Sequence, residues 1–319
     1  MTMQRKVITS SAAAAFLVLA GCGGSSGGGG DDTDTTLDRS GQAIDGYLVD
    51  AAVCVDVNLN AVCDDGEPSA TSSDEGQWDI SGFDNRFANA PTLVRATAGQ
   101  TTDTDIGGTI SESFRLKAPA SAKVVTPITT LVQQRAQSAL VDGTAADVAE
   151  AVANAKASVE SDLGSGVSGV DILNDDYVAA QASDDSATQT AAKKLATTSR
   201  ALNTVILDTI RRINSNLSDA DKTNLDSNGT VEAAILNVAA TKSGGNLSSI
   251  SSDVSSAIDS GGEDADLDQI ASDASSNNVV TGAYSNIESE LSQEVSDIET
   301  AEDTLVEEEE TGATGGTGG

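Results

Sequence analysis

A short stretch near the start of the chain combines acidic and amide side chains with the spacing of a calcium-binding loop. Counted from Asp56 as position one, side chains with oxygen atoms fall at positions one, three, five, nine and twelve, and position seven offers its backbone carbonyl. This is the ligand order of a twelve-residue loop of EF-hand type, whose last residue is a carboxylate that binds through both oxygens. The predicted calcium ligands are Asp56, Asn58, Asn60, Val62, Asp64 and Glu67. An alternative is a turn in which the same side chains accept hydrogen bonds from their own backbone.

Position six of this loop departs from the usual pattern, because Ala61 stands where the sharp turn favours glycine. We therefore expect weak calcium binding, with a dissociation constant of about 10⁻⁴–10⁻³ M, as in extracellular modules. Asp103 and Asp105, further along the chain, either supply a second cation site or form a solvated turn.

Two cysteines, Cys54 and Cys63, bracket most of the loop. In an exported chain, where disulfides persist, this spacing predicts a bridge between them. The alternative is a pair of unpaired buried thiols. A zinc site is excluded, since it needs four ligands and the chain contains no histidine to add to these two thiols.

The first residues of the chain have the pattern of an export signal. Arg5 and Lys6 precede a mostly apolar run over residues 7–19, which is too short to span a bilayer, and the run ends in Leu-Ala-Gly-Cys at Cys22. These residues resemble the lipobox of bacterial lipoproteins. The resemblance implies that residues 1–21 are removed and that Cys22 carries fatty acyl groups such as palmitate. By the same resemblance Gly23 favours the outer membrane, on its periplasmic face or at the cell surface; the alternative is an ordinary signal peptide with an incidental cysteine.

The composition is strongly acidic, with 50 Asp and Glu against 17 Lys and Arg and a formal net charge of −33. This balance argues against binding to nucleic acid, whose phosphates need basic side chains, and against attraction to an anionic lipid surface. The absence of histidine removes the commonest general base. The Gly-x-Gly-x-x-Gly match at residues 164–169 follows a predicted helix rather than a strand, so it indicates a loop and not a nucleotide site.

The hydrophobic pattern divides the chain into parts and predicts an α+β, two-domain protein. Residues 22–41 are rich in Gly, Ser, Asp and Thr and are expected to form a flexible tether. Short apolar runs separated by turn residues over 42–123 predict a small antiparallel β-sandwich. Helical periodicity over 124–308 predicts an all-α domain, and residues 309–319 are expected to be disordered.

The sandwich segment also resembles a known module. The resemblance lies in the run Ile44–Val53, the Asp-x-Asn-x-Asn loop, Gly66-Glu67-Pro68 and the series Thr71, Asp74, Gly76 and Trp78. These residues are similar to the carboxypeptidase-regulatory-like and B-type repeats of bacterial surface proteins. The resemblance implies a prealbumin-like sandwich, calcium in the loop and no peptidase activity.

Amphipathic stripes define the helical half. Thr126 is a predicted N-cap before Pro127 at the first helical position. Further helices are expected over residues 144–163, 186–217, 231–240, 247–258 and 284–305. Their apolar stripes indicate core packing. The last helix either packs back onto the others or offers a coiled-coil face.

Taken together, these patterns predict a lipid-anchored protein of the cell envelope that is not an enzyme. Its calcium-stabilised β-module would act in binding, adhesion or scaffolding, with another envelope protein or a polysaccharide as partner. One alternative is a structural envelope protein that self-associates through its last helix. Ranked below it is a polysaccharide hydrolase that uses paired carboxylates, which an acidic chain always contains. The sequence leaves the oligomeric state open.

Overall fold

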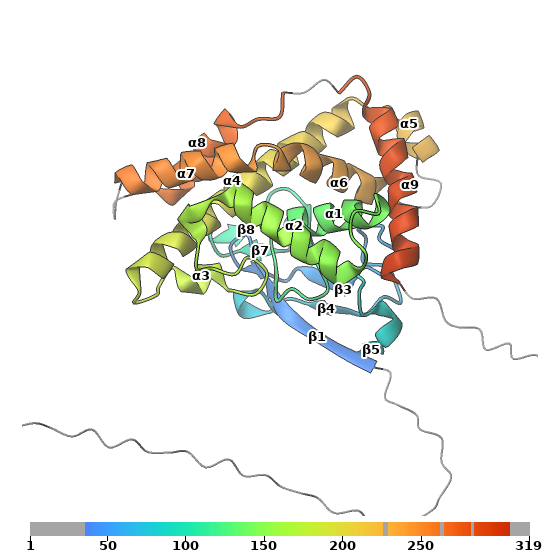
Figure 1. The fold of residues 1–319 in the computed structure, drawn as a ribbon, viewed down its shortest axis with the longest axis horizontal. Helices are drawn as coiled ribbons and strands as arrows, with labels where there is room; N and C mark the ends of the chain where they lie inside the picture. Colours follow the sequence, from blue (N-terminus) through green and yellow to red (C-terminus); the bar gives the residue numbers. More distant parts are fainter. Residues whose placement is uncertain (1–35, 226–228, 262–264, 282–283, 307–319) are drawn as a thin grey trace, which may run out of the picture. The chain divides into compact units, whose positions relative to one another are not determined.

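Strands come first along the chain and helices follow, as Figure 1 shows. The computed structural model describes residues 36–225, 229–261, 265–281 and 284–306. The mixed fold with an N-terminal β part is therefore confirmed. The strands are β1 (Thr36–Ala43), β2 (Leu48–Val49), β3 (Ala52–Val55), β4 (Ser69–Thr71), β5 (Gln77–Asp84), β6 (Thr92–Ala96), β7 (Thr102–Asp103), β8 (Gly108–Thr109), β9 (Phe114–Ala118) and β10 (Val124–Val125).

The strands pair into three small sheets, with strand orders β10-β1-β5, β2-β7-β8 and β4-β3-β6-β9. All of the pairings are antiparallel except that of β10 with β1. Strand β5 shows why these residues form strands: Trp78 and Ile80 are buried on one face, while Gln77 and Asp79 point to the exposed face, as their alternation predicts. In β6, successive residues Leu93 and Val94 are both fully buried, so both faces of this strand are covered.

Strand β1 corrects the predicted tether, which is wrong for residues 36–41. This strand lacks a strong apolar pattern, and a buried arginine fixes it instead. The Arg39 guanidinium donates to the Ala90 carbonyl at 2.8 Å and to Thr92 Oγ1 at 3.2 Å. Opposite Trp78 stands Gly41, where a side chain would collide with the indole ring. The predicted signal peptide with Cys22 and the predicted tail at 309–319 lie outside the described residues.

The helices follow the predicted order. They are α1 (Pro127–Val141), α2 (Val148–Leu163), α3 (Tyr177–Ala180), α4 (Ser186–Ser215), α5 (Asp219–Leu225), α6 (Val231–Gly244), α7 (Leu247–Gly261), α8 (Leu267–Asn277) and α9 (Ile287–Leu305). The N-cap at Thr126 is confirmed: its side chain accepts from the Thr129 N–H, and the Thr129 hydroxyl accepts from the Thr126 N–H. Helices α3, α5 and α8 were not expected from the sequence.

The start of α2 corrects a second prediction, because the helix begins at Val148 and not at Thr144. The Asp147 carboxylate accepts the Glu150 N–H at 2.8 Å and so caps α2. The Thr144 hydroxyl instead donates to the Ala139 carbonyl at the end of α1. Thr144, the predicted first residue of this helix, therefore bonds to the end of α1 instead.

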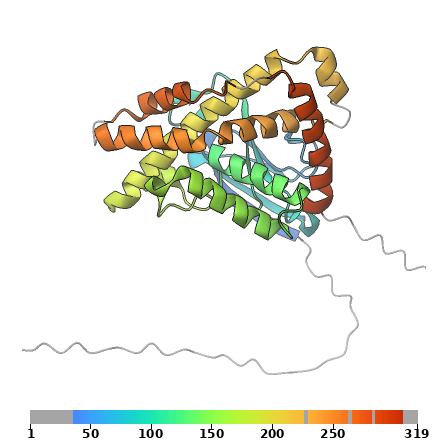
Figure 2. The same cartoon turned by 45° about the horizontal axis from the view of Figure 1, so that its top comes forward.

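The described helices and strands share one continuous hydrophobic core. Helix α1 packs on β9, and the long helix α4 contacts α6, α7 and α8. Figure 2 shows the helices gathered over one side of the strands, with α9 along one edge. Helix α9 contacts α6 and α1, and it buries Ile287, Leu291, Ile298 and Leu305. The prediction that this helix packs back onto the others is confirmed.

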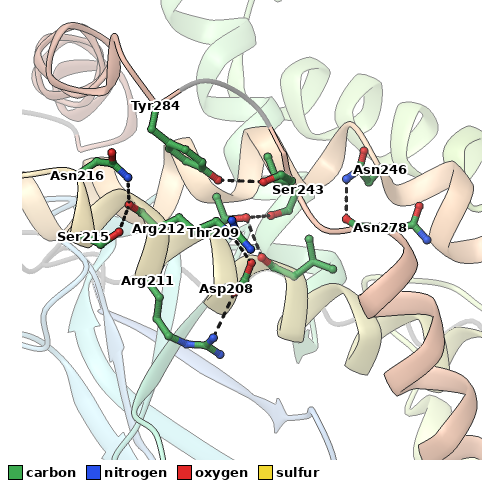
Figure 3. A network of polar contacts seen from close by, with 12 residues as sticks. Asp208, Thr209, Arg211, Arg212, Ser215, Asn216, Ser243, Asn246, Asn278 and Tyr284 are labelled. Carbon is green, nitrogen blue, oxygen red and sulfur yellow. Dashed lines mark hydrogen bonds and ion pairs between the residues drawn. The ribbon is translucent and has the colours of Figure 1, made fainter.

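Polar contacts also join the helices to one another, as Figure 3 shows. Thr209 Oγ1 of α4 and Ser243 Oγ of α6 lie 3.3 Å apart in the interior. The Asn246 amide, between α6 and α7, donates to the Asn278 carbonyl just after α8 at 2.7 Å. These contacts tie α4 to α6, and the junction of α6 and α7 to the end of α8.

Candidate metal centre

The predicted calcium loop connects β3 to β4, and we call residues Asp56–Glu67 the metal loop. Cys54, the third residue of β3, forms a disulfide with Cys63 inside the loop, with their Cα atoms 5.6 Å apart. The predicted disulfide is therefore confirmed. Because β3 is paired on both sides, the bridge fixes the middle of the metal loop to the sheet.

The first and last predicted ligands fold back onto the backbone between them. Asp56 Oδ2 accepts the Ala61 N–H at 3.1 Å. The Glu67 carboxylate accepts the Val57 N–H through Oε1 at 2.9 Å and the Asp64 N–H through Oε2 at 3.0 Å. The residue at position twelve thus closes the loop with both of its oxygens facing inward.

The three remaining side chains of the predicted set meet inside the loop. Asp64 Oδ2 accepts from Asn58 Nδ2 at 3.0 Å and from Asn60 Nδ2 at 2.7 Å. The backbone N–H of Val62, whose carbonyl is the predicted ligand at position seven, donates to Asn60 Oδ1 at 2.7 Å. An asparagine presents its oxygen in place of its nitrogen once the amide turns, so both amides are able to face a cation. The structure therefore brings the predicted side chains together.

The backbone of the metal loop makes the sharp turn without glycine. Ala61 has a φ of 58° and Leu59 a φ of 53°, both in the left-handed region. For a residue with a Cβ atom, this conformation costs about 1–2 kcal/mol. Both residues are fully buried, so packing and the hydrogen bond from Ala61 to Asp56 offset that cost. Ala61 at position six therefore adopts the left-handed conformation that a glycine usually provides there.

Burial makes the two end carboxylates of the loop costly to ionise. Asp56 is fully buried and Glu67 is 9% exposed. Burial raises the pKa of Glu67 to about 7, against the lowering effect of its bonds to the Asp64 and Val57 N–H groups. Burial also raises the pKa of Asp56. A cation held between these carboxylates would offset the cost of ionising them.

One oxygen of this site has no partner: Asp56 Oδ1 is buried and accepts no hydrogen bond from any described residue. A buried acceptor of this kind is usually satisfied by an ordered water or an ion. The donor set is also right for calcium, which takes carboxylate, amide and carbonyl oxygens. Across the described residues no group of three or more His, Cys, Asp or Glu side chains is placed to hold a metal ion. The predicted set reaches its ligand number only by including two amides and a carbonyl, and with those oxygens the residues fit calcium.

A basic side chain on another strand of the same sheet lies beside the first residue of the metal loop. Lys117 of β9 is 1% exposed, and its Nζ lies 3.9 Å from Asp56 Oδ2. Burial lowers the pKa of Lys117 and raises that of Asp56, and each partner's charge opposes the other's shift. Sequence reasoning missed this residue, because 61 positions separate it from Asp56 and no local pattern marks it.

The second candidate cation site has a different structure from either expectation. Asp103 lies in β7 and is 6% exposed, so the solvated turn is wrong for this residue. The Arg200 guanidinium of α4 pairs with Asp105 and Asp268. Asp45 Oδ2 accepts from Asn203 Nδ2 at 2.6 Å. We call Asp45, Asp103, Asp105, Arg200 and Asn203 the acid–arginine cluster, in which an arginine already supplies the positive charge.

The Gly-rich segment at residues 164–169 follows α2 and contains a single short helical turn, so the prediction of a loop is confirmed.

Among the helices that the structure describes, none has the length and apolar character needed to cross a membrane. No protein-family model, curated protein or solved structure matches this chain.

Proposed function

We propose that this chain is a lipid-anchored protein of the cell envelope whose calcium-stabilised β part serves as a binding or scaffold module. The observation that carries the proposal is the metal loop. Its first carboxylate is fully buried with an oxygen that has no hydrogen-bond partner in the described part of the chain, and its last carboxylate closes the loop with both oxygens turned inward. A loop with these features gains stability from a hard cation, and calcium is the cation that its oxygen donors fit.

The anchoring part of the proposal rests on the sequence, since Cys22 lies outside the described residues. The charged start, the apolar run and the Leu-Ala-Gly-Cys ending support acylation of Cys22 and an outer-membrane location. An exported location also agrees with the disulfide at Cys54 and Cys63, because such bridges persist in oxidising compartments.

We also propose that the β part is a sandwich of the prealbumin-like kind found in the surface-protein repeats that it resembles. Sheets of three and four strands and the doubly covered strand β6 support this reading. The partner surface would lie on the helical half and would take another envelope protein or a polysaccharide. No observation favours the self-associating alternative, since the apolar residues of α9 are buried within the chain.

The test is the capture of partners from solubilised envelope with the full acylated protein. Three forms are compared: the wild type, Glu67→Gln and Asp65→Asn. Asp65 lies in the same loop and is exposed, so its substitution removes the same charge without touching a predicted ligand. We expect the wild type and Asp65→Asn to recover the same envelope component with calcium present, and Glu67→Gln to recover less. Equal recovery by all three forms, or recovery unchanged by a chelator, contradicts a calcium-stabilised binding module.

The anchor is tested separately by Cys22→Ser. This substitution removes the acylated thiol, so we expect the protein to move from the membrane fraction to the soluble fraction. Mass spectrometry of the wild-type N-terminus is expected to show acyl groups on Cys22. An unmodified cysteine, or a membrane fraction unchanged by the substitution, would show that the chain is not lipid-anchored.

A further inference from the structure

Lys117 contacts the metal loop from outside it and carries a charge opposite to that of the predicted ligands. The side chains of Lys117 and Asp56 are 2% and 0% exposed, and their charged atoms are 3.9 Å apart. That separation is too long for a hydrogen bond. Among the described residues, neither Lys117 Nζ nor Asp56 Oδ1 has a hydrogen-bond partner. The two groups thus attract one another but are incompletely satisfied.

A second carboxylate faces Lys117 from the helical half. The charge of Glu294, on α9, acts on Lys117 with the same sign as that of Asp56. Glu294 is held in place by Asn237 of α6, whose Nδ2 donates to Glu294 Oε1 at 2.9 Å. Lys117 is therefore attracted both by Asp56 of the metal loop and by the Glu294 carboxylate of α9.

We propose that Lys117 is a built-in counter-ion that competes with calcium for Asp56 and so sets the calcium affinity of the metal loop. The proposal rests on the calcium binding proposed above and names a residue that determines its strength. Three predicted ligands carry a negative charge: Asp56, Asp64 and Glu67. An ammonium beside Asp56 cancels one of these charges before a cation arrives. It also repels a bound cation, with little screening because the pair is buried.

Groups of the protein itself already offset part of the negative charge of the metal loop. Lys117 offsets part of the charge of Asp56, and the backbone N–H groups bind Glu67. When calcium takes Asp56, Glu294 remains as the carboxylate that faces Lys117. Calcium affinity should then depend on both residues, and in opposite directions.

The test is calorimetric titration of calcium into the full chain and its variants. Lys117→Met keeps the length of the side chain and removes its charge, so we expect calcium to bind at least tenfold more tightly. Lys123→Met is the matched control, because Lys123 is an exposed lysine of the same β part and its loss changes the net charge equally. We expect the control to stay within twofold of the wild type.

A second variant decides the matter if Lys117→Met does not fold. Glu294→Gln changes a half-buried side chain and leaves Lys117 with Asp56 as its main carboxylate partner. We expect the dissociation constant for calcium to be at least threefold higher in this variant than in the wild type.

The inference is overturned if the wild type binds calcium and Lys117→Met binds it with the same affinity. If Lys117→Met does not fold, unchanged affinity in Glu294→Gln overturns it. In both cases the calcium site itself stands. Absence of heat in every form overturns the calcium site itself and this inference with it. Binding by Lys117→Met but not by the wild type supports this inference, since it shows that the lysine excludes the cation, and it overturns calcium binding by the wild-type chain.

Discussion

The β part contains two groups of acidic side chains that balance their charge in different ways. In the metal loop, the carboxylates come from one continuous stretch, and the nearest cation is Lys117, 3.9 Å from Asp56. In the acid–arginine cluster, the carboxylates come from separate segments, and Arg200 bonds Asp105 directly. Asn203 then bonds Asp45.

The difference shows where a metal ion is needed. The acid–arginine cluster has an arginine fork that fits carboxylates and holds its charge at all relevant pH values. The metal loop has a lysine that lies beyond hydrogen-bond distance of Asp56, and an acceptor, Asp56 Oδ1, with no partner among the described residues. We therefore expect calcium to act on the metal loop and protons to act on the acid–arginine cluster. Four predictions test this contrast, in order of decreasing effect on stability, with the direct measurement of calcium binding last.

The largest expected effect is a loss of folding stability with rising pH, and its cause is the ionisation of Asp45. Burial first, and then the charge of Asp103, raise the pKa of Asp45 to about 7. An unfolded aspartate has a pKa of about 3.9. Because the folded state holds the proton more tightly, the stabilisation is complete below pH 4 and is lost as pH rises to 7. The full change is on the order of 4 kcal/mol.

The measurement is denaturant unfolding between pH 5 and 8 for the wild type and Asp45→Asn. Glu67 shifts in the same direction, so the difference between the two proteins isolates Asp45. We expect a shallower decline in Asp45→Asn, and the same decline as the wild type in the exposed control Asp79→Asn. Parallel curves for the wild type and Asp45→Asn contradict the assignment.

The second prediction concerns the disulfide, which constrains only the metal loop. Replacing Cys54 and Cys63 with serine opens a loop closed over a sequence separation of 9. The chain-entropy relation gives a loss of about 2–3 kcal/mol. Chemical unfolding of the double variant measures this loss. The variant should also bind calcium more weakly, while the part of its pH dependence that comes from Asp45 in the acid–arginine cluster should stay the same.

The third prediction is stabilisation by calcium itself. With a dissociation constant of about 10⁻⁴–10⁻³ M, calcium at ~10 mM adds about 1.4–2.7 kcal/mol. Thermal unfolding should show a higher Tm with calcium than with an equal concentration of magnesium, which demands an octahedral site. Hydrogen exchange should slow at residues 56–67 and stay unchanged at Asp103 and Asp105. Protection at the acid–arginine cluster instead would place the cation there.

The same contrast explains how much of the molecule could be predicted from its sequence. The metal loop and its disulfide are local, so the spacing of their residues sufficed to find them. Helices with long apolar stripes, such as α4 and α9, were also found. Strand β1 was missed because its residues are polar and it is fixed by Arg39, which bonds residues about fifty positions away.

The acid–arginine cluster could not be found in this way. Asp45 and Asn203 are 158 positions apart, and nothing in their neighbouring residues marks them as a pair. Lys117 was missed for the same reason, since its strand β9 joins the sheet of β3 only through the pairing of both strands with β6. The residues that balance charge come from distant parts of the chain, whereas the candidate ligands are neighbours.

The measurement that tests the central claim most directly is calorimetric titration of calcium into the wild type, Glu67→Gln and Asp65→Asn. The wild type should show one site with a dissociation constant of about 10⁻⁴–10⁻³ M. Glu67→Gln should abolish the heat, because it removes the carboxylate that closes the loop, and Asp65→Asn should retain it. A wild type that gives no heat at millimolar calcium, or binding that survives Glu67→Gln, would contradict the assignment of the metal loop.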